Sequence, residues 1–155
     1  MKLQISTRLA LYAALQLAAD SRKQFAAAEI AERFGISVNH LAKVLRTLGR
    51  AGLVEAVRGA GGGYRFRGNV KRVTLFDVIQ LLEDVGNGRG DEEPGADSDE
   101  GRALRRVLDE IDDIARATLR SITLATMLKL MQESPGAPEG AATATPPAGR
   151  AARAR

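Results

Sequence analysis

The 155-residue chain contains no cysteine and only one histidine, His40. Without cysteine it can form no disulfide, no zinc–thiolate site, no thiolate-held iron–sulfur cluster and no cysteine nucleophile. A single imidazole is too few for a histidine-based metal site within one chain. Apolar runs are also short, since none approaches the roughly 18 residues that a membrane span requires, and no cleavage pattern follows the N-terminal apolar segment. We therefore expect a soluble, cytoplasmic protein with no membrane contact.

The net charge of +4 hides a strong asymmetry along the chain. Residues 1–80 carry 13 Lys/Arg against 5 Asp/Glu, residues 81–113 carry 4 against 12, and residues 114–155 carry 6 against 2. A basic first half attracts polyanions through its long-range field and through counterion release. The alternative is an arginine-rich composition that only keeps the protein in solution.

Apolar spacing predicts three helices in the first 52 residues. Residues 7–19 are apolar on most faces, which predicts a helix buried on more than one side. Residues 26–34 form a second helix that ends at Gly35, and Ser37 is the expected N-cap of a third. Two short helices joined by a glycine turn are typical of a helix-turn-helix. The inner face of the third helix, which ends at residues 51–52, is predicted to consist of Val38, Leu41, Val44, Leu45 and Leu48.

The pattern then changes to short strands. Residues 53–57 and 64–67 alternate as strands around the loop 58–63, and a hairpin directly after a helix-turn-helix predicts the wing of a winged helix. A helix over 75–85 follows, with Thr74 and Asp77 as its cap. Residues 86–101 contain five glycines and six acids and no large apolar residue, which indicates a flexible loop.

The last periodic segment predicts a helix over 102–121, followed by a short helix over 124–131 that Thr123 can cap. The long helix carries an apolar stripe, and no other segment of comparable length within the chain could cover it. A second copy of the same helix is the simplest partner, and folding back onto the winged helix is the alternative. A dimer would place two recognition helices about 34 Å apart for a palindromic site. The stripe consists of Leu104, Leu108, Ile111, Ala115, Leu119 and Ile122.

We therefore expect a mainly α fold with a small β-hairpin wing, a winged helix-turn-helix with a long dimerisation helix. Residues 1–85 would be the DNA-binding domain and 86–101 a flexible acidic loop. Residues 102–131 would hold the dimerisation helix and the short terminal helix. Residues 132–155 would be a disordered tail, because they cannot bury enough apolar surface to offset ordering.

The outward face of the third helix carries groups suited to DNA. Asparagine pairs with adenine, arginine or lysine with guanine, and a serine at a helix N-terminus suits a phosphate oxygen. The alternative is the solvated face of a winged helix that binds only protein. The predicted DNA-binding residues are Ser37, Asn39, His40, Lys43 and Arg46 on the helix and Arg58 and Tyr64 at the wing, with Arg50 also facing outward.

The glycine run of the wing does not match a nucleotide site. A dinucleotide fingerprint leads into a helix, whereas Tyr64 replaces its last glycine before a strand, and a Walker loop needs Gly-Lys-Ser/Thr. A thin hairpin tip that delivers Arg58 to a minor groove is the preferred interpretation, with a plain tight turn as the alternative. The acidic loop lacks the calcium-loop spacing, and no catalytic set is recognisable, so we expect neither an enzyme nor a metal site.

Three segments resemble the BadM/Rrf-type winged-helix transcription regulators, which include IscR- and NsrR-like members. They are MKLQISTRLALYAALQLA, EIAERFGISVNHLAKVLRTLGRAGLVEAVRGAGGGYRF and ITLATML, and the resemblance covers residues 1 to about 131. It implies DNA contacts by Asn39, Lys43 and Arg58, and a long helix that crosses to a partner chain.

The chain departs from this family where many members hold an iron–sulfur cluster. The resemblance places their three cysteines near Gly90, Ala96 and Arg102, and the non-cysteine ligand of some members at Arg105 or Arg8. None of these residues can ligate iron. The chain thus resembles a cluster-less member, or a sequence from which the cysteines were removed. We expect no cofactor and a homodimeric repressor of unidentified effector that binds double-stranded DNA. The alternatives are a protein-interaction module, or control by a protein partner or small effector at the acidic loop.

Overall fold

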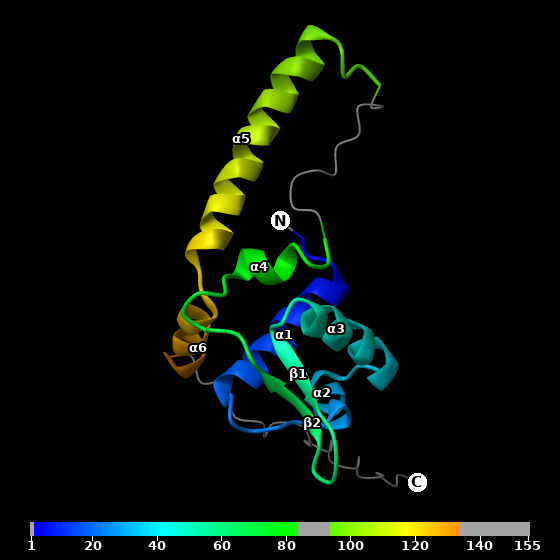
Figure 1. The fold of residues 1–155 in the computed structure, drawn as a ribbon. Coiled ribbons are helices and arrows are strands. Elements are labelled where there is room, and N and C mark those ends of the chain that lie inside the picture. Colours follow the sequence, from blue (N-terminus) through cyan, green and yellow to red (C-terminus); the bar gives the residue numbers. More distant parts are fainter. Residues whose placement is uncertain (1, 84–93, 134–155) are drawn as a thin grey trace, which may run out of the picture.

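The N-terminal helix is the centre of the fold. The computed structural model describes residues 2–83 and 94–133. Helix α1 (Ile5–Ala19) is buried at ten of its fifteen positions, as its nearly all-round apolar surface requires. It packs against α3, α4, α6 and β2, which surround it in Figure 1. The prediction of a helix buried on several sides is confirmed, although the helix begins two residues earlier than expected.

Helices α2 (Ala27–Phe34) and α3 (Val38–Arg50) form the helix-turn-helix. Helix α2 ends at Gly35, whose φ of +64° is the left-handed conformation that glycine adopts without steric penalty. Ser37 then caps α3, because its Oγ accepts a hydrogen bond from the N–H of His40 at 3.1 Å. The predicted turn and cap are both confirmed.

The wing is an antiparallel hairpin of β1 (Val54–Val57) and β2 (Gly63–Phe66). Val54 lies opposite Phe66, and both side chains are buried in the core. On its other edge β2 pairs with a single residue between α1 and α2. The N–H of Phe25 donates to the Tyr64 carbonyl at 2.9 Å, and the N–H of Tyr64 donates back at 2.8 Å. This bridge holds the wing against the helix-turn-helix.

The remaining helices leave this body and return to it. Helix α4 (Leu75–Ile79) is capped by the expected pair, since the N–H of Asp77 donates to Thr74 Oγ1 at 3.2 Å and the N–H of Thr74 donates to Asp77 Oδ2 at 2.8 Å. Helix α5 (Asp99–Ser121) projects away from the other helices, and α6 (Leu124–Glu133) lies back beside them (Figure 1). Leu124 is fully buried and anchors this return. The predicted fold class is confirmed.

Helix α4 is shorter than the expected helix over 75–85. Val78 and Ile79 are fully buried, which ties this short helix to the core. The N–H groups of Leu81 and Leu82 then bond to carbonyls three residues back, at 3.3 and 3.0 Å, and this tightens the chain into turns up to residue 83. Residues 84–85 lie outside the described part.

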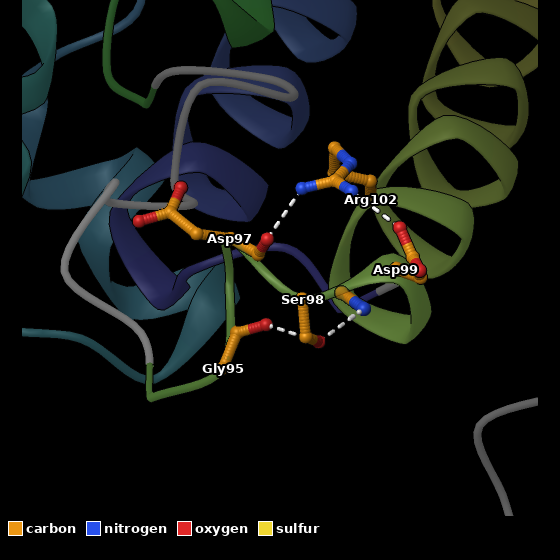
Figure 2. Close-up of polar contacts among 6 residues, drawn as sticks. Gly95, Asp97, Ser98, Asp99 and Arg102 are labelled. Atoms are coloured by element: carbon orange, nitrogen blue, oxygen red, sulfur yellow. Dashed lines mark hydrogen bonds and ion pairs between the residues drawn. The ribbon is translucent and has the colours of Figure 1, made fainter.

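Helix α5 begins at Asp99, three residues before the expected start. Ser98 Oγ accepts a hydrogen bond from the N–H of Gly101 at 3.0 Å (Figure 2), and the carboxylates of Asp99 and Glu100 suit the first turn of a helix. Residues 99–101, expected in the acidic loop, are therefore helical.

Helix α6 runs to Glu133, two residues past the expected end at 131, so residues 132–133 are helical and not part of the expected tail. The acidic loop up to residue 93 and the tail from residue 134 lie outside the described residues. Within residues 2–83 and 94–133, no helix combines the length and apolar character of a membrane crossing.

Candidate DNA-binding surface

The outward face of α3 is polar and cationic, as predicted. Asn39, Lys43, Arg46 and Arg50 are exposed. Within the described part of the chain, neither Lys43 nor Arg46 forms an ion pair. The opposite face of the helix anchors it in the core. Its four inward residues are each at most 2% exposed: Leu41, Val44, Leu45 and Leu48.

Val38 is the exception on the inner face of α3. It was expected to lie with the buried residues but is 47% exposed. As the first residue of the helix, it lies one turn beyond the core that covers Leu41 and Leu45. The apolar spacing alone carries no information about where that covering ends.

His40 lies differently from the other predicted contacts. It is half-buried, and its Nε2 lies 3.2 Å from Ser6 Oγ in the first turn of α1. The N-terminal ends of α1 and α3 are thereby joined. This contact spans 34 positions of the sequence, so local pattern could not reveal it.

Arg58 is exposed at the tip of the wing, where the glycine run has specific structural causes. Gly59 and Gly61 have φ values of +108° and +74°, a region that favours glycine. A Cβ at Gly62 would collide with the Val57 carbonyl oxygen, and one at Gly63 with that of Phe25. Turn geometry therefore accounts for Gly59, Gly61 and Gly62, and the close approach of the Phe25 backbone accounts for Gly63. The entry of Arg58 into a minor groove stays a prediction.

Tyr64 is half-buried, and its side chain packs against the core. Its backbone is paired with Phe25 on one side and with Ala56 on the other. The structure thus gives Tyr64 a role in anchoring the wing. A contact of Tyr64 with DNA stays a prediction.

Two further cations on the wing were not singled out from the sequence. Arg65 and Arg67 are exposed, and both guanidiniums reach the carboxylate of Glu55 on the neighbouring strand, Arg67 at 3.6 Å. The alternation of Tyr-Arg-Phe-Arg is the signal that could have found them, because it places both arginines on the face opposite Phe66.

The long helix presents an uncovered apolar face. Helix α5 has no buried residue, which argues against the alternative that it folds back onto its own winged helix. Val107 and Ile114 belong to the face although they were absent from the predicted stripe, while Leu108, Ala115 and Leu119 are half-buried. The most exposed members, between 53% and 61%, are Leu104, Val107, Ile111 and Ile114.

This architecture and sequence match a known group of proteins. The sequence profile of the Rrf2 family, described as "Iron-dependent Transcriptional regulator", matches residues 3–130. The chain belongs to the Rrf2 family. It is 50% identical over 155 residues to a Rhodopseudomonas palustris protein named as the HTH-type transcriptional regulator BadM, and the aligned region covers 97% of this chain and 99% of that one. It is 33% identical over 135 residues to the transcriptional regulator IscR of Vibrio campbellii, and this aligned region covers 83% of this chain and 78% of that one.

Solved structures of this family agree with the fold. The structure of T. potens IscR has a TM-score of 0.71 at 29% identity, covering 89% of this chain and 93% of that one. The structure of CymR, the global cysteine regulator of B. subtilis, has a TM-score of 0.70 at 26% identity and covers 84% and 98%. The resemblance noted from the sequence is confirmed. The Rrf2 relatives are named as transcription regulators, a non-enzymatic role, as the sequence predicted.

The iron named in the family description can be tested against the residues of this chain. Of the positions where the resemblance places cluster ligands, Gly90 lies outside the described residues and Ala96 has no donor side chain. Arg102, Arg105 and Arg8 carry guanidiniums, which are cationic and have no acceptor. Among the described residues, no three His, Asp or Glu side chains gather as a metal site. The residues do not fit an iron–sulfur cluster.

Proposed function

We propose that this Rrf2-family regulator is a cytoplasmic, sequence-specific DNA-binding protein that works without an iron–sulfur cluster. It acts as a homodimer on a palindromic operator and represses transcription by occupying promoter DNA. Residues 1–85 bind DNA, and the helices within 102–131 join two copies. The observation that carries the proposal is the pair of exposed cations on α3, Lys43 and Arg46, which have no ion pair among the described residues.

Each predicted contact has a place in this proposal. Ser37 and Asn39 at the start of α3 meet a phosphate and a base edge, and Lys43 and Arg46 continue along the major groove. Arg58 enters the neighbouring minor groove, where a narrow groove concentrates negative potential.

The two half-buried residues have restricted roles. Ser6 engages Nε2 of His40, so Nδ1 is the ring nitrogen left for DNA. The ring of Tyr64 packs on the core, so this residue reaches DNA only through its hydroxyl.

The apolar face of α5 supports the dimer. Four large side chains more than half exposed along one helix form a patch of the kind that marks an interface. A second copy of α5 covers it symmetrically, and two recognition helices then meet successive major-groove segments about 34 Å apart.

Salt-dependent binding tests the DNA function directly. A genomic fragment selected by the full-length protein is titrated at several salt concentrations with the wild type and with Lys43→Ala, Arg58→Ala and Lys129→Ala. Lys129 is the matched control, because it is an exposed lysine on α6, outside the candidate DNA-binding surface of α3 and the wing. We expect Lys43→Ala and Arg58→Ala each to lower affinity about tenfold, and the salt slope to fall by about one for each lost phosphate contact. Lys129→Ala should bind like the wild type.

A binding curve without a salt slope, unchanged by both substitutions, would show that the protein does not bind DNA through this surface. That outcome favours a winged helix that binds only protein. The repressor role is tested separately with a reporter driven by the selected fragment. Its expression should rise when the regulator is deleted, and a fall would identify an activator.

A further inference from the structure

The only histidine of the chain lies between the helix-turn-helix and the central helix of the fold. Helices α1 and α3 pack against each other (Figure 1). Nε2 of His40, in the first turn of α3, lies 3.2 Å from Oγ of Ser6, in the first turn of α1. Both side chains are half-buried. A residue outside the helix-turn-helix therefore contacts a predicted DNA-binding side chain.

Both ends of this contact are fixed by their neighbours. Thr7, next to Ser6, and Leu41, next to His40, are fully buried. The N–H of His40 also donates to the capping hydroxyl of Ser37 at 3.1 Å, so the backbone beneath the ring is held as well. An imidazole ring otherwise turns over between two roughly equivalent orientations. The contact with Ser6 selects the orientation that directs Nε2 toward α1.

The hydroxyl and the ring can share a proton in two ways. A serine hydroxyl has one donor, and a neutral imidazole carries its proton on only one of its two nitrogens. Among residues 2–83 and 94–133, neither Ser6 Oγ nor the His40 ring forms another hydrogen bond. If the hydroxyl donates to Nε2, its proton is satisfied and Nδ1 carries the ring proton. In the reverse arrangement, Nδ1 is a bare acceptor and the hydroxyl proton has no partner in the described part of the chain.

The proposed ligand of this surface favours the first arrangement. DNA presents hydrogen-bond acceptors, namely phosphate oxygens along its backbone and N7 of both purines in the major groove. A protonated Nδ1 can donate to any of these atoms, whereas an unprotonated Nδ1 would repel them. The first turns of α1 and α3 contain no acidic residue that could accept from Nδ1 instead.

We propose that Ser6 is a positioning residue for DNA binding. Its hydroxyl holds His40 as the tautomer protonated on Nδ1, and Nδ1–H donates to an acceptor atom of the operator. The role of Ser6 in DNA binding rests on the proposed function, whereas the tautomer of His40 is a property of the free protein. The central helix thus takes part in DNA recognition through one hydrogen bond.

Nitrogen-15 NMR of the free, untagged full-length protein tests the tautomer. Because His40 is the only histidine, its two ring nitrogens give the only imidazole signals. The spectra are recorded at about pH 8.5, where an imidazole is ordinarily neutral. We expect a protonated Nδ1 and an unprotonated Nε2 in the wild type, and loss of this preference in Ser6→Ala. A protonated Nε2 in the wild type, or an unchanged pattern in Ser6→Ala, would overturn the proposal.

A double-mutant cycle tests the effect on DNA affinity. The fragment selected by the full-length protein is titrated with the wild type, Ser6→Ala, His40→Ala and the double variant. We expect Ser6→Ala to weaken binding about three- to tenfold, as for the loss of one hydrogen bond. It should cause no further loss once residue 40 is alanine.

Ser121→Ala is the matched control. It also removes a serine hydroxyl, one that donates to the Thr118 carbonyl at 2.7 Å at the C-terminal end of α5, outside α3 and the wing. Its DNA affinity should equal that of the wild type. Unrelated DNA of the same length identifies the acceptor in the same assay. An equal loss on both DNAs in Ser6→Ala indicates a phosphate oxygen, and a loss on the selected fragment alone indicates a base atom.

Two results of the titration would show that Ser6 does not position His40. They are an affinity of Ser6→Ala equal to that of the wild type, or an equal loss with and without His40. Thermal melts check that each variant is folded. Lys43→Ala and Arg58→Ala separate this proposal from the DNA-binding function. If neither lowers the affinity, the proposed surface is wrong; if both do and Ser6→Ala does not, only the role of Ser6 is rejected.

Discussion

The substitution Ile111→Glu tests the dimer through the centre of the apolar face of α5. Ile111 is 53% exposed in the protomer, so a partner would bury roughly half of its side chain. Full burial of an isoleucine contributes about 1.5–3 kcal/mol, and the remaining half therefore contributes about 1 kcal/mol in each of two chains. Losing about 2 kcal/mol raises the dimer dissociation constant about thirtyfold. This change of about thirtyfold is a lower bound, because the dimer would also have to remove the two introduced glutamate carboxylates from water.

Sedimentation velocity over a range of protein concentrations measures this dissociation constant. The matched control is Asp113→Ala, since Asp113 lies on the other side of α5 with its side chain 73% exposed. It should leave the dimer intact. Because α5 has no buried residue in the protomer, circular dichroism of Ile111→Glu should keep its helical signal. A dissociation constant equal to that of the wild type would show that this face is not the interface.

Two further substitutions test the helix-turn-helix and the wing by urea denaturation. Ser37→Ala removes the cap of α3 and should lower the free energy of unfolding by about 1 kcal/mol; an unchanged midpoint would mean that the cap contributes nothing. Gly63→Ala places a methyl group against the Phe25 carbonyl and should cost about 1–3 kcal/mol. Gly49→Ala is the matched control, because a Cβ at Gly49 would have its nearest neighbour 3.8 Å away. An alanine at this helical position should stabilise the protein by about 0.5–1 kcal/mol. Similar changes in the unfolding free energy of both variants would show that Gly63→Ala causes no collision.

Much of the DNA-binding unit could be predicted because its signals are local. A left-handed glycine at position 35, a capping serine at 37 and inward leucines at 41, 45 and 48 are all set within one or two turns of helix. The ends of α4 and α5 were less predictable. The end of α4 depends on how deeply Val78 and Ile79 are anchored, and the start of α5 on the turn that Ser98 closes.

The candidate site was predicted in composition but not in its connections. Outward placement of Lys43 and Arg46 follows from helical periodicity. The contact of His40 with Ser6 and the pairing of Phe25 with Tyr64 join residues 34 and 39 positions apart, respectively.

The sequence by itself determined the absence of thiolate chemistry, the helix-turn-helix with its wing, and the apolar stripe of the long helix, because composition and short-range periodicity are properties of the chain alone. Only the tertiary structure decided that α5 projects uncovered, that His40 is held by α1, and that Phe25 pairs with Tyr64 beside the wing. The physical reason is that such contacts depend on which distant segments share one core, and local preferences do not specify that choice.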